Sequence, residues 1–449
     1  MIKELGGGRK VQMNNVVLVE DGEGYSLAAH ALRSAVLREL HARPFTSIPV
    51  SSRILHFAFA TSEGRTQTDR ANLAEFCKKQ DVALPPGEEK YHRVRLGTTA
   101  LRWEQHSEFT TYTWEIPSEV DATPFNPKTT SLASAMTLIP QPGPLLVALD
   151  LHLLPEREDL VPARLFDRAS LAIAENSDGK ALYATDFQPD SVGFVRVLVV
   201  DRGLDRERAG ALVQRIVEVE TYRTLALLGL PEARRLAPTI SLIEKRLVEV
   251  MDEMRRANDL ASNRRLLNEL MELAAEVEAG AAASVFRFGA SRAYQEIVQQ
   301  RLQTIGERKQ GGFSTWSSFL ARRMAPAMRT CATLDARQAN LSVKLSRAAD
   351  LLRTRVDVEL EQQNQELLQS MNARTRLQLR LQTTVEGLSV AAITYYVVGL
   401  FGYLVKAAHD TGRLWIEPNY VIAGFVPVAA LMIWSIVHRI RRKHVSDEE

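Results

Sequence analysis

The sequence GLSVAAITYYVVGLFGYLV fills residues 387–405, and PNYVIAGFVPVAALMIWSIV fills residues 418–437. Neither run contains a charged residue; Glu386 and Lys406 flank the first, and Arg439 closely follows the second. At 1.5 Å per residue each run covers roughly 30 Å, the thickness of a bilayer hydrocarbon core. A buried core helix can be equally apolar. Two such runs in succession, each ending near a charge, favour two transmembrane helices instead.

Basic residues near the two runs predict how they are oriented. Three precede the first run and four follow the second: Arg374, Arg376, Arg380, Arg439, Arg441, Arg442 and Lys443. The connecting loop, residues 406–419, has Lys406 and Arg413 as its only Lys or Arg. Since cytoplasmic flanks are enriched in Lys and Arg, we expect a multi-pass protein with both termini in the cytoplasm and the loop outside.

Composition argues against several classes of protein. A net charge of +2 gives no reason to expect nucleic acid as a partner. The two cysteines, Cys77 and Cys331, lie far apart and outside any metal-ligand spacing, which is typical of a reducing compartment. Residues 1–11 are polar and contain no apolar run, so no signal peptide is expected there.

Residues 1–203 carry the signals of a mixed α/β domain. A helix is expected over residues 26–41, with Ser26 as its N-cap. β-Branched and aromatic runs, separated by Pro- and Gly-containing stretches, then predict strands over 53–60, 92–104, 108–116, 145–153 and 192–201. The order of these strands in a sheet does not follow from the sequence.

The chain turns helical after Gly203. Asp205 is placed to cap a helix that ends at Leu228, and Gly229 and Pro231 then end it and begin the next.

Residues 204–312 form a predicted helical hairpin region. Gly280 is expected to break it, and Gly311 with Gly312 is expected to form a hinge before a long stalk helix, residues 313–386.

The stalk is predicted to be continuous with the first membrane run. No proline occurs from Ala327 to the second run and no glycine before Gly387, so the helix would extend to Val405, roughly 120 Å. Small or apolar residues recur at a spacing near 3.67, which favours a straight or slightly right-handed bundle: Leu341, Leu345, Ala349, Leu352, Val356, Leu360, Leu367 and Met371. This coiled-coil-like stripe would pack on the chain's own helices, residues 231–310, or on copies of itself in a homo-oligomer, and the two can coexist.

The sequence contains few candidate catalytic or ligand-binding motifs. No phosphate-binding loop, dinucleotide fingerprint, zinc-protease motif or nucleophile elbow occurs, so we expect neither an enzyme nor a cofactor. The segment ELHARPF, residues 39–45, is interpreted as a helix C-terminal cap, or else as an anion- or partner-binding group. Asp357 and Glu361 lie one turn apart on the stalk, where bundled copies would collect a divalent cation; the alternative is a solvated face.

Three stretches resemble a bacterial family of membrane-anchored proteins of unknown function. They are ELHARPF at 39–45, ETYRTLALLGLPEAR at 220–234 and TVEGLSVAAITYYVVGL at 384–400. The resemblance covers most of the chain. It implies location in the bacterial inner (cell) membrane and supplies no activity.

The layout also resembles the CorA family of magnesium channels, which have a cytoplasmic α/β domain, a long helix entering the first span and a basic tail. CorA proteins carry Gly-Met-Asn at the outer end of the first span. Here the candidate pore positions are Gly399, Gly402 and Tyr403: Gly402 matches, whereas Tyr403 and Leu404 replace Met and Asn. Because the family's asparagine contacts the hydrated ion, its loss puts magnesium selectivity in doubt.

The sequence therefore predicts an α+β cytoplasmic domain followed by long helices and two C-terminal transmembrane helices in a CorA-like layout. The anchor comprises residues 387–437 and the basic cytoplasmic tail residues 438–449. We expect a homo-oligomeric scaffold or sensor in contact with membrane lipid. The alternative is a CorA-like divalent-cation channel or transporter with a degenerate selectivity motif.

Overall fold

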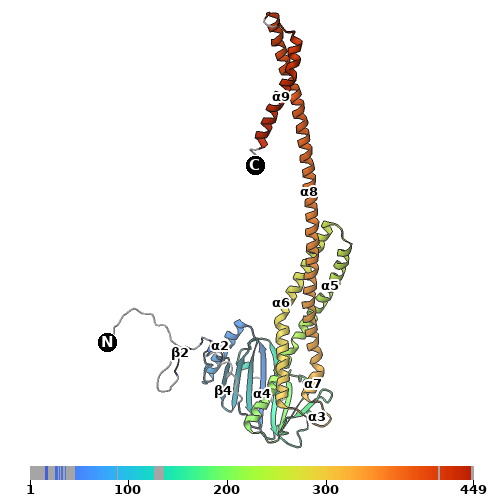
Figure 1. The fold of residues 1–449 in the computed structure, drawn as a ribbon. Coiled ribbons are helices and arrows are strands. Elements are labelled where there is room, and N and C mark those ends of the chain that lie inside the picture. The colour runs from blue at the N-terminus through green and yellow to red at the C-terminus, as the bar shows by residue number, and fades with distance from the viewer. Residues whose placement is uncertain are drawn as a thin grey trace, which may run out of the picture. The chain divides into compact units, whose positions relative to one another are not determined.

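The structure is a computed structural model that describes residues 16–18, 26–28, 30, 32, 33, 36, 46–87, 89–125, 136–412 and 415–445 (Figure 1). The chain divides into two compact units. The first comprises Met1–Val248 and Glu272–Leu345, and the second comprises Glu249–Met271 and Ser346–Glu449.

The first unit is built on a nine-stranded mixed sheet with the order β11-β8-β9-β10-β7-β3-β6-β5-β4. Only β7 and β10 run parallel, and all other neighbouring strands in this sheet are antiparallel. The strands are β3 (Ser52–Ala60), β4 (Tyr91–Leu96), β5 (Thr99–Gln105), β6 (Phe109–Pro117), β7 (Leu145–Pro155), β8 (Ala172–Glu175), β9 (Ala181–Thr185), β10 (Val195–Asp201) and β11 (Arg308–Lys309).

Most predicted strands are confirmed, with one run divided. Residues 53–60, 108–116, 145–153 and 192–201 correspond to β3, β6, β7 and β10. The run 92–104 is instead the hairpin of β4 and β5, because Gly97 adopts a φ of 62° and turns the chain. Strands β8, β9 and β11 were not predicted from the sequence.

Helices cover both faces of this sheet. On one face α2 (Glu63–Lys79) packs Leu73, Phe76 and Cys77 into a cluster with strand residues such as Trp103. The short α3 (Pro162–Leu165) adds to a neighbouring cluster. On the opposite face lie α4 (Arg206–Leu227), the end of α6 (Leu260–Ile305) and α7 (Trp316–Arg323), whose Trp316 is fully buried.

The boundary between α4 and α5 (Gly229–Arg256) lies where it was predicted. Asp205 caps α4 by accepting a hydrogen bond of 2.7 Å from the Arg208 backbone N–H. Gly229 starts α5 and lies where a Cβ would approach Ser291 Oγ to 2.6 Å. A glycine here lets α5, α6 and α8 (Ala325–Asp410) approach closely.

The predicted break at Gly280 is wrong. Helix α6 runs through it, and a Cβ there would lie 3.3 Å from Gln338 Nε2, so this glycine serves close helix packing. The break lies earlier, between Arg256 and Leu260. There Asp259 accepts a hydrogen bond of 2.8 Å from the Ser262 backbone N–H. Gly311, with a φ of 57°, lies in a turn between β11 and α7.

The long stalk helix is continuous, as predicted: α8 begins at Ala325, just before Pro326, and ends at Asp410. In the second unit Arg355 donates to the Met254 carbonyl at 2.7 Å, and Asn263 donates to Glu359 at 3.2 Å. A turn follows, and α9 (Pro418–Val445) completes the chain described by the structure.

The N-terminal helix prediction is wrong at its start. Ser26 begins a short strand, β2 (Ser26–Ala28), which pairs with β1 (Val16–Leu18). ELHARPF, residues 39–45, lies outside the described residues, so its interpretation as a cap stays a prediction.

Candidate functional site

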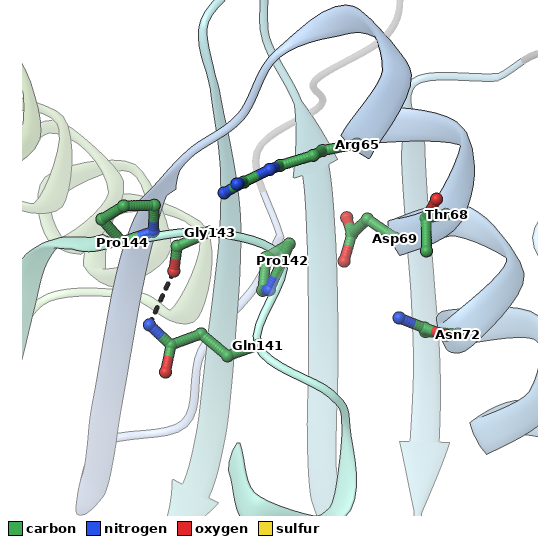
Figure 2. A pocket seen from close by; sticks show the side chains of 8 residues that line it. All are labelled: Arg65, Thr68, Asp69, Asn72, Gln141, Pro142, Gly143 and Pro144. Atoms are coloured by element: carbon green, nitrogen blue, oxygen red, sulfur yellow. Dashed lines mark hydrogen bonds between the residues drawn. The ribbon is translucent and has the colours of Figure 1, made fainter.

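A polar pocket of about 470 Å³ opens between helix α2 and the loop that leads into β7 (Figure 2). One face of α2 supplies Arg65, Thr68, Asp69 and Asn72, at helical spacing. The loop, residues 141–144, supplies the opposite wall. In Figure 2, Asp69 and Asn72 point from the helix toward the loop, and Arg65 reaches over them toward Gly143.

Asp69 is the unusual member of this group, because it is a carboxylate that is only 1% exposed. Its two oxygens accept hydrogen bonds from Tyr112 Oη at 2.6 Å and from Trp103 Nε1 at 2.9 Å. Burial raises the pKa of Asp69, and these two hydrogen bonds oppose that rise. Among the described residues no cation pairs with Asp69.

The loop wall is held rigidly. A Cβ on Gly143 would lie 1.8 Å from the Ala60 carbonyl oxygen, so only glycine fits at this position. The Ala60 backbone N–H donates to the Pro144 carbonyl at 2.9 Å, and Gln141 Nε2 donates to the Gly143 carbonyl at 2.6 Å. The pocket is thus preformed by backbone packing.

A second polar group lies buried between the sheet and α4, around His56. Its ring nitrogens lie 2.8 Å from Thr113 Oγ1 and 3.0 Å from Thr221 Oγ1. Because the Thr221 hydroxyl donates to the Val217 carbonyl, we assign Nε2 as the protonated nitrogen. Burial, reinforced by the charge of Arg102, lowers the pKa of His56 to about 3, so the imidazole is neutral.

Arg53, Asp150 and His152 form a buried charged group on the α2 face of the sheet. Arg53 donates two hydrogen bonds of 2.8 Å to the two oxygens of Asp150, and His152 Nε2 lies 3.4 Å from Asp150 Oδ1. Burial alone would raise the pKa of Asp150. The hydrogen bonds from His152 and Arg53 outweigh it and lower that pKa. Such a paired group holds neighbouring strands β3 and β7 in register.

The stretch ETYRTLALLGLPEAR proves to be a packing element. Glu220 is buried and accepts two hydrogen bonds from Arg223, whose guanidinium lies over the Phe187 ring. Thr221 contacts His56, and Tyr222 stacks on Tyr294. The residues of this stretch therefore serve to pack α4 and α6 against each other and against the sheet.

The candidate pore positions lie where α8 and α9 meet or on exposed surface. A Cβ on Gly402 would lie 3.4 Å from Ile422 of α9, and next to it Phe401 stacks on Phe425 at 3.9 Å. Tyr403 is 76% exposed, and a Cβ on Gly399 would meet no atom within 4 Å. The three positions lie within about one turn of α8, on the same side of the helix, and their role in a pore stays a prediction.

The stalk acids Asp357 and Glu361 are both exposed on α8. In the part of the chain that the structure describes, no three His, Cys, Asp or Glu side chains gather as a metal site would require.

Sequence reasoning missed both the pocket and the His56 group. Their members are spread over α2, separate strands and a loop, so no local spacing could reveal them. Nothing in the sequence around Asp69 separates it from the other polar residues of α2.

Comparison with protein-family models identifies the family of the chain. The model of a family described as "Protein of unknown function (DUF3422)" matches residues 28–444. No curated protein matches the sequence.

Proposed function

The chain belongs to the DUF3422 family of proteins of unknown function, and we propose that it is a homo-oligomeric, membrane-anchored scaffold without enzymatic activity. Two C-terminal helices would hold it in the bacterial inner membrane with both termini in the cytoplasm. The long helix α8 would join copies to one another.

The two C-terminal helices support the anchor. Both are long and apolar enough to cross a membrane, and only 6% and 11% of their most apolar windows are buried within the protein. A core helix of this composition would be mostly buried. Large side chains such as Leu400, Leu404 and Leu431, each at least 67% exposed, would lie in lipid.

The stripe along α8 supports self-association, and it is the observation on which this proposal rests. Leu345 and Leu352 are fully buried and Val356 is nearly so, which favours packing on the chain's own helices over this part of α8. Every residue from 361 to 385 is exposed, a length of nearly 40 Å.

The uncovered part is amphipathic only in part. Counting 3.6 residues per turn places five large apolar residues on one half of the helix: Leu367, Met371, Leu377, Leu381 and Val385. The same half turns polar at Arg374, Gln378 and Gln382, and Leu368 and Leu379 lie on the other half. The opposite half carries Gln365, Gln369, Asn372, Arg376 and Arg380. Because the apolar half continues the buried stripe, a second copy of the same helix is the partner that matches it in length and pattern.

The test is the mass of the full-length protein in detergent micelles. We expect an oligomer for the wild type. Leu367→Asp together with Met371→Asp should reduce its mass, because charges would be buried at each contact. Gln365→Asp together with Gln369→Asp adds the same charge to the opposite half and should leave the oligomer intact. A monomeric wild type, or an oligomer that survives the Leu367 and Met371 changes, would overturn self-association through the stalk.

The channel alternative has less support. Gly402 contacts α9, Tyr403 is exposed, and among the described residues the stalk acids gather no third ligand. Lipid is therefore the proposed partner at the membrane, and no bound cation enters this proposal.

A further inference from the structure

The pocket between α2 and the 141–144 loop holds two opposite charges that do not pair with each other. Arg65 is exposed, and its side chain has no ion-pair or hydrogen-bond partner among the described residues. Asp69 has neutral donors, Trp103 and Tyr112, and no cation. In Figure 2 the Arg65 guanidinium extends away from the Asp69 carboxylate, which leaves space between the two.

We propose that this pocket binds a small zwitterion, with its ammonium group on Asp69 and its carboxylate on Arg65. A carboxylate oxygen has two lone pairs, so each Asp69 oxygen retains one after accepting from Tyr112 or Trp103. An arginine presents a planar fork of donors that matches a carboxylate. The Asn72 side chain, which also has no hydrogen-bond partner among the described residues, adds a donor and an acceptor beside them.

The charge balance of the pocket selects this class of ligand. A phosphate compound would bring a multiply charged anion next to Asp69, with Arg65 as the single cation lining the pocket. A simple cation would leave Arg65 unmatched. A molecule with one charge of each sign satisfies both, and 470 Å³ is within the usual range for a small-molecule pocket.

The apolar residues and the rigid loop around the two charges favour a small ligand. Pro142 and Pro144 supply apolar surface that would face the ligand's uncharged part. Because Gly143 is fixed against Ala60, the loop wall does not have to reorganise on binding. Binding here would make the sheet domain a small-molecule sensor, which adds to the scaffold role and does not depend on it.

The experiment measures binding to the full-length protein in detergent by calorimetry. The probes are the twenty protein amino acids, tested one at a time. For the best binder, we then compare its amide, which keeps only the ammonium group, and its N-acetyl derivative, which keeps only the carboxylate. We expect each single-charge analogue to bind at least tenfold more weakly than the parent, and glycerol not to bind.

Variants separate the two charges. Arg65→Gln should weaken the parent amino acid at least tenfold and leave the affinity for the amide unchanged, because only the carboxylate contact is lost. Lys78→Gln removes one positive charge from the same helix outside the pocket and should change neither affinity. Asp69→Asn should abolish binding of both, and if that variant does not fold, Arg65→Gln still decides the question. Failure of all twenty amino acids to bind, equal binding of glycerol, or an Arg65→Gln protein that binds like the wild type would overturn the proposal.

Discussion

At the scale of single residues, His56 links the stability of the sheet domain to pH. Its pKa is about 3 in the fold and 6.5 when unperturbed. Between these values the unfolded chain binds a proton that the folded chain does not, so stability falls as pH falls below about 6.5. The loss is about 1.4 kcal/mol per pH unit, on the order of 5 kcal/mol in all.

A variant isolates this contribution from those of the carboxylates. His56→Gln should be less stable than the wild type at pH 7 by about 1–3 kcal/mol, because a buried hydrogen-bonded group is changed. Its stability should, however, fall less steeply between pH 6.5 and 5. Urea unfolding of the full chain in detergent, followed by tryptophan fluorescence, measures both slopes. Identical slopes would show that folding does not lower the pKa of His56.

Gly229 makes a second residue-level prediction. A Cβ there would lie 2.6 Å from Ser291 Oγ and 3.2 Å from Cys331 Sγ, both ends of short side chains. Gly229→Ala should therefore cost about 1–3 kcal/mol by overpacking. Adding Ser291→Gly removes the closest contact and should recover part of that loss; no recovery in a thermal unfolding measurement would contradict the packing role.

Which residues could be predicted from sequence depends on how far away their partners lie. Asp205 was recognisable as a cap because its partner, the Arg208 N–H, is three residues away. His56 meets Thr113 and Thr221 only after the sheet and α4 have formed. Asp69 likewise depends on strands β5 and β6. Such groups leave no local pattern to detect.

At the scale of elements, periodicity predicted most helices and strands, whereas glycine was ambiguous. Gly97 turns the chain with a positive φ, but Gly280 lies within a helix and permits close packing. The same residue type has both uses, so sequence alone did not separate them. Strands β8 and β9 were missed because they are four and five residues long.

The stripe of α8 leads to a prediction about the element that covers it. Leu352 is fully buried within the single chain, so Leu352→Ala should cost about 2–5 kcal/mol. The effect should appear as faster hydrogen exchange in residues 249–271 and around residue 352. Val358→Ala, at a 60% exposed position one to two turns further along the helix, is the matched control and should change exchange little. Equal exchange in the two variants would mean that the stripe is not covered by the chain's own helices here.

At the scale of the whole molecule, composition was sufficient to predict the two apolar helices, because a run without charge that is long enough to span a membrane can be seen directly in the sequence. Strand order was not predictable. The parallel pairing of β7 with β10 and the insertion of β3 between β7 and β6 depend on contacts between distant segments. The pocket and the proposed self-association were equally hard to predict, since both require surfaces assembled from several elements or copies.

Orientation in the membrane is the last prediction. The basic residues just before the first run and just after the second outnumber those in the connecting loop. The loop near Thr411 should therefore lie outside the cell membrane and the C-terminus in the cytoplasm. Thr411→Cys should react with a membrane-impermeant maleimide on intact cells, whereas Ser446→Cys should react only after lysis. The native Cys77 and Cys331 are buried, so the unmodified protein serves as the background control. Labelling of Ser446→Cys on intact cells would reverse the orientation. Labelling of both sites on intact cells would mean that the second run does not cross the membrane between them.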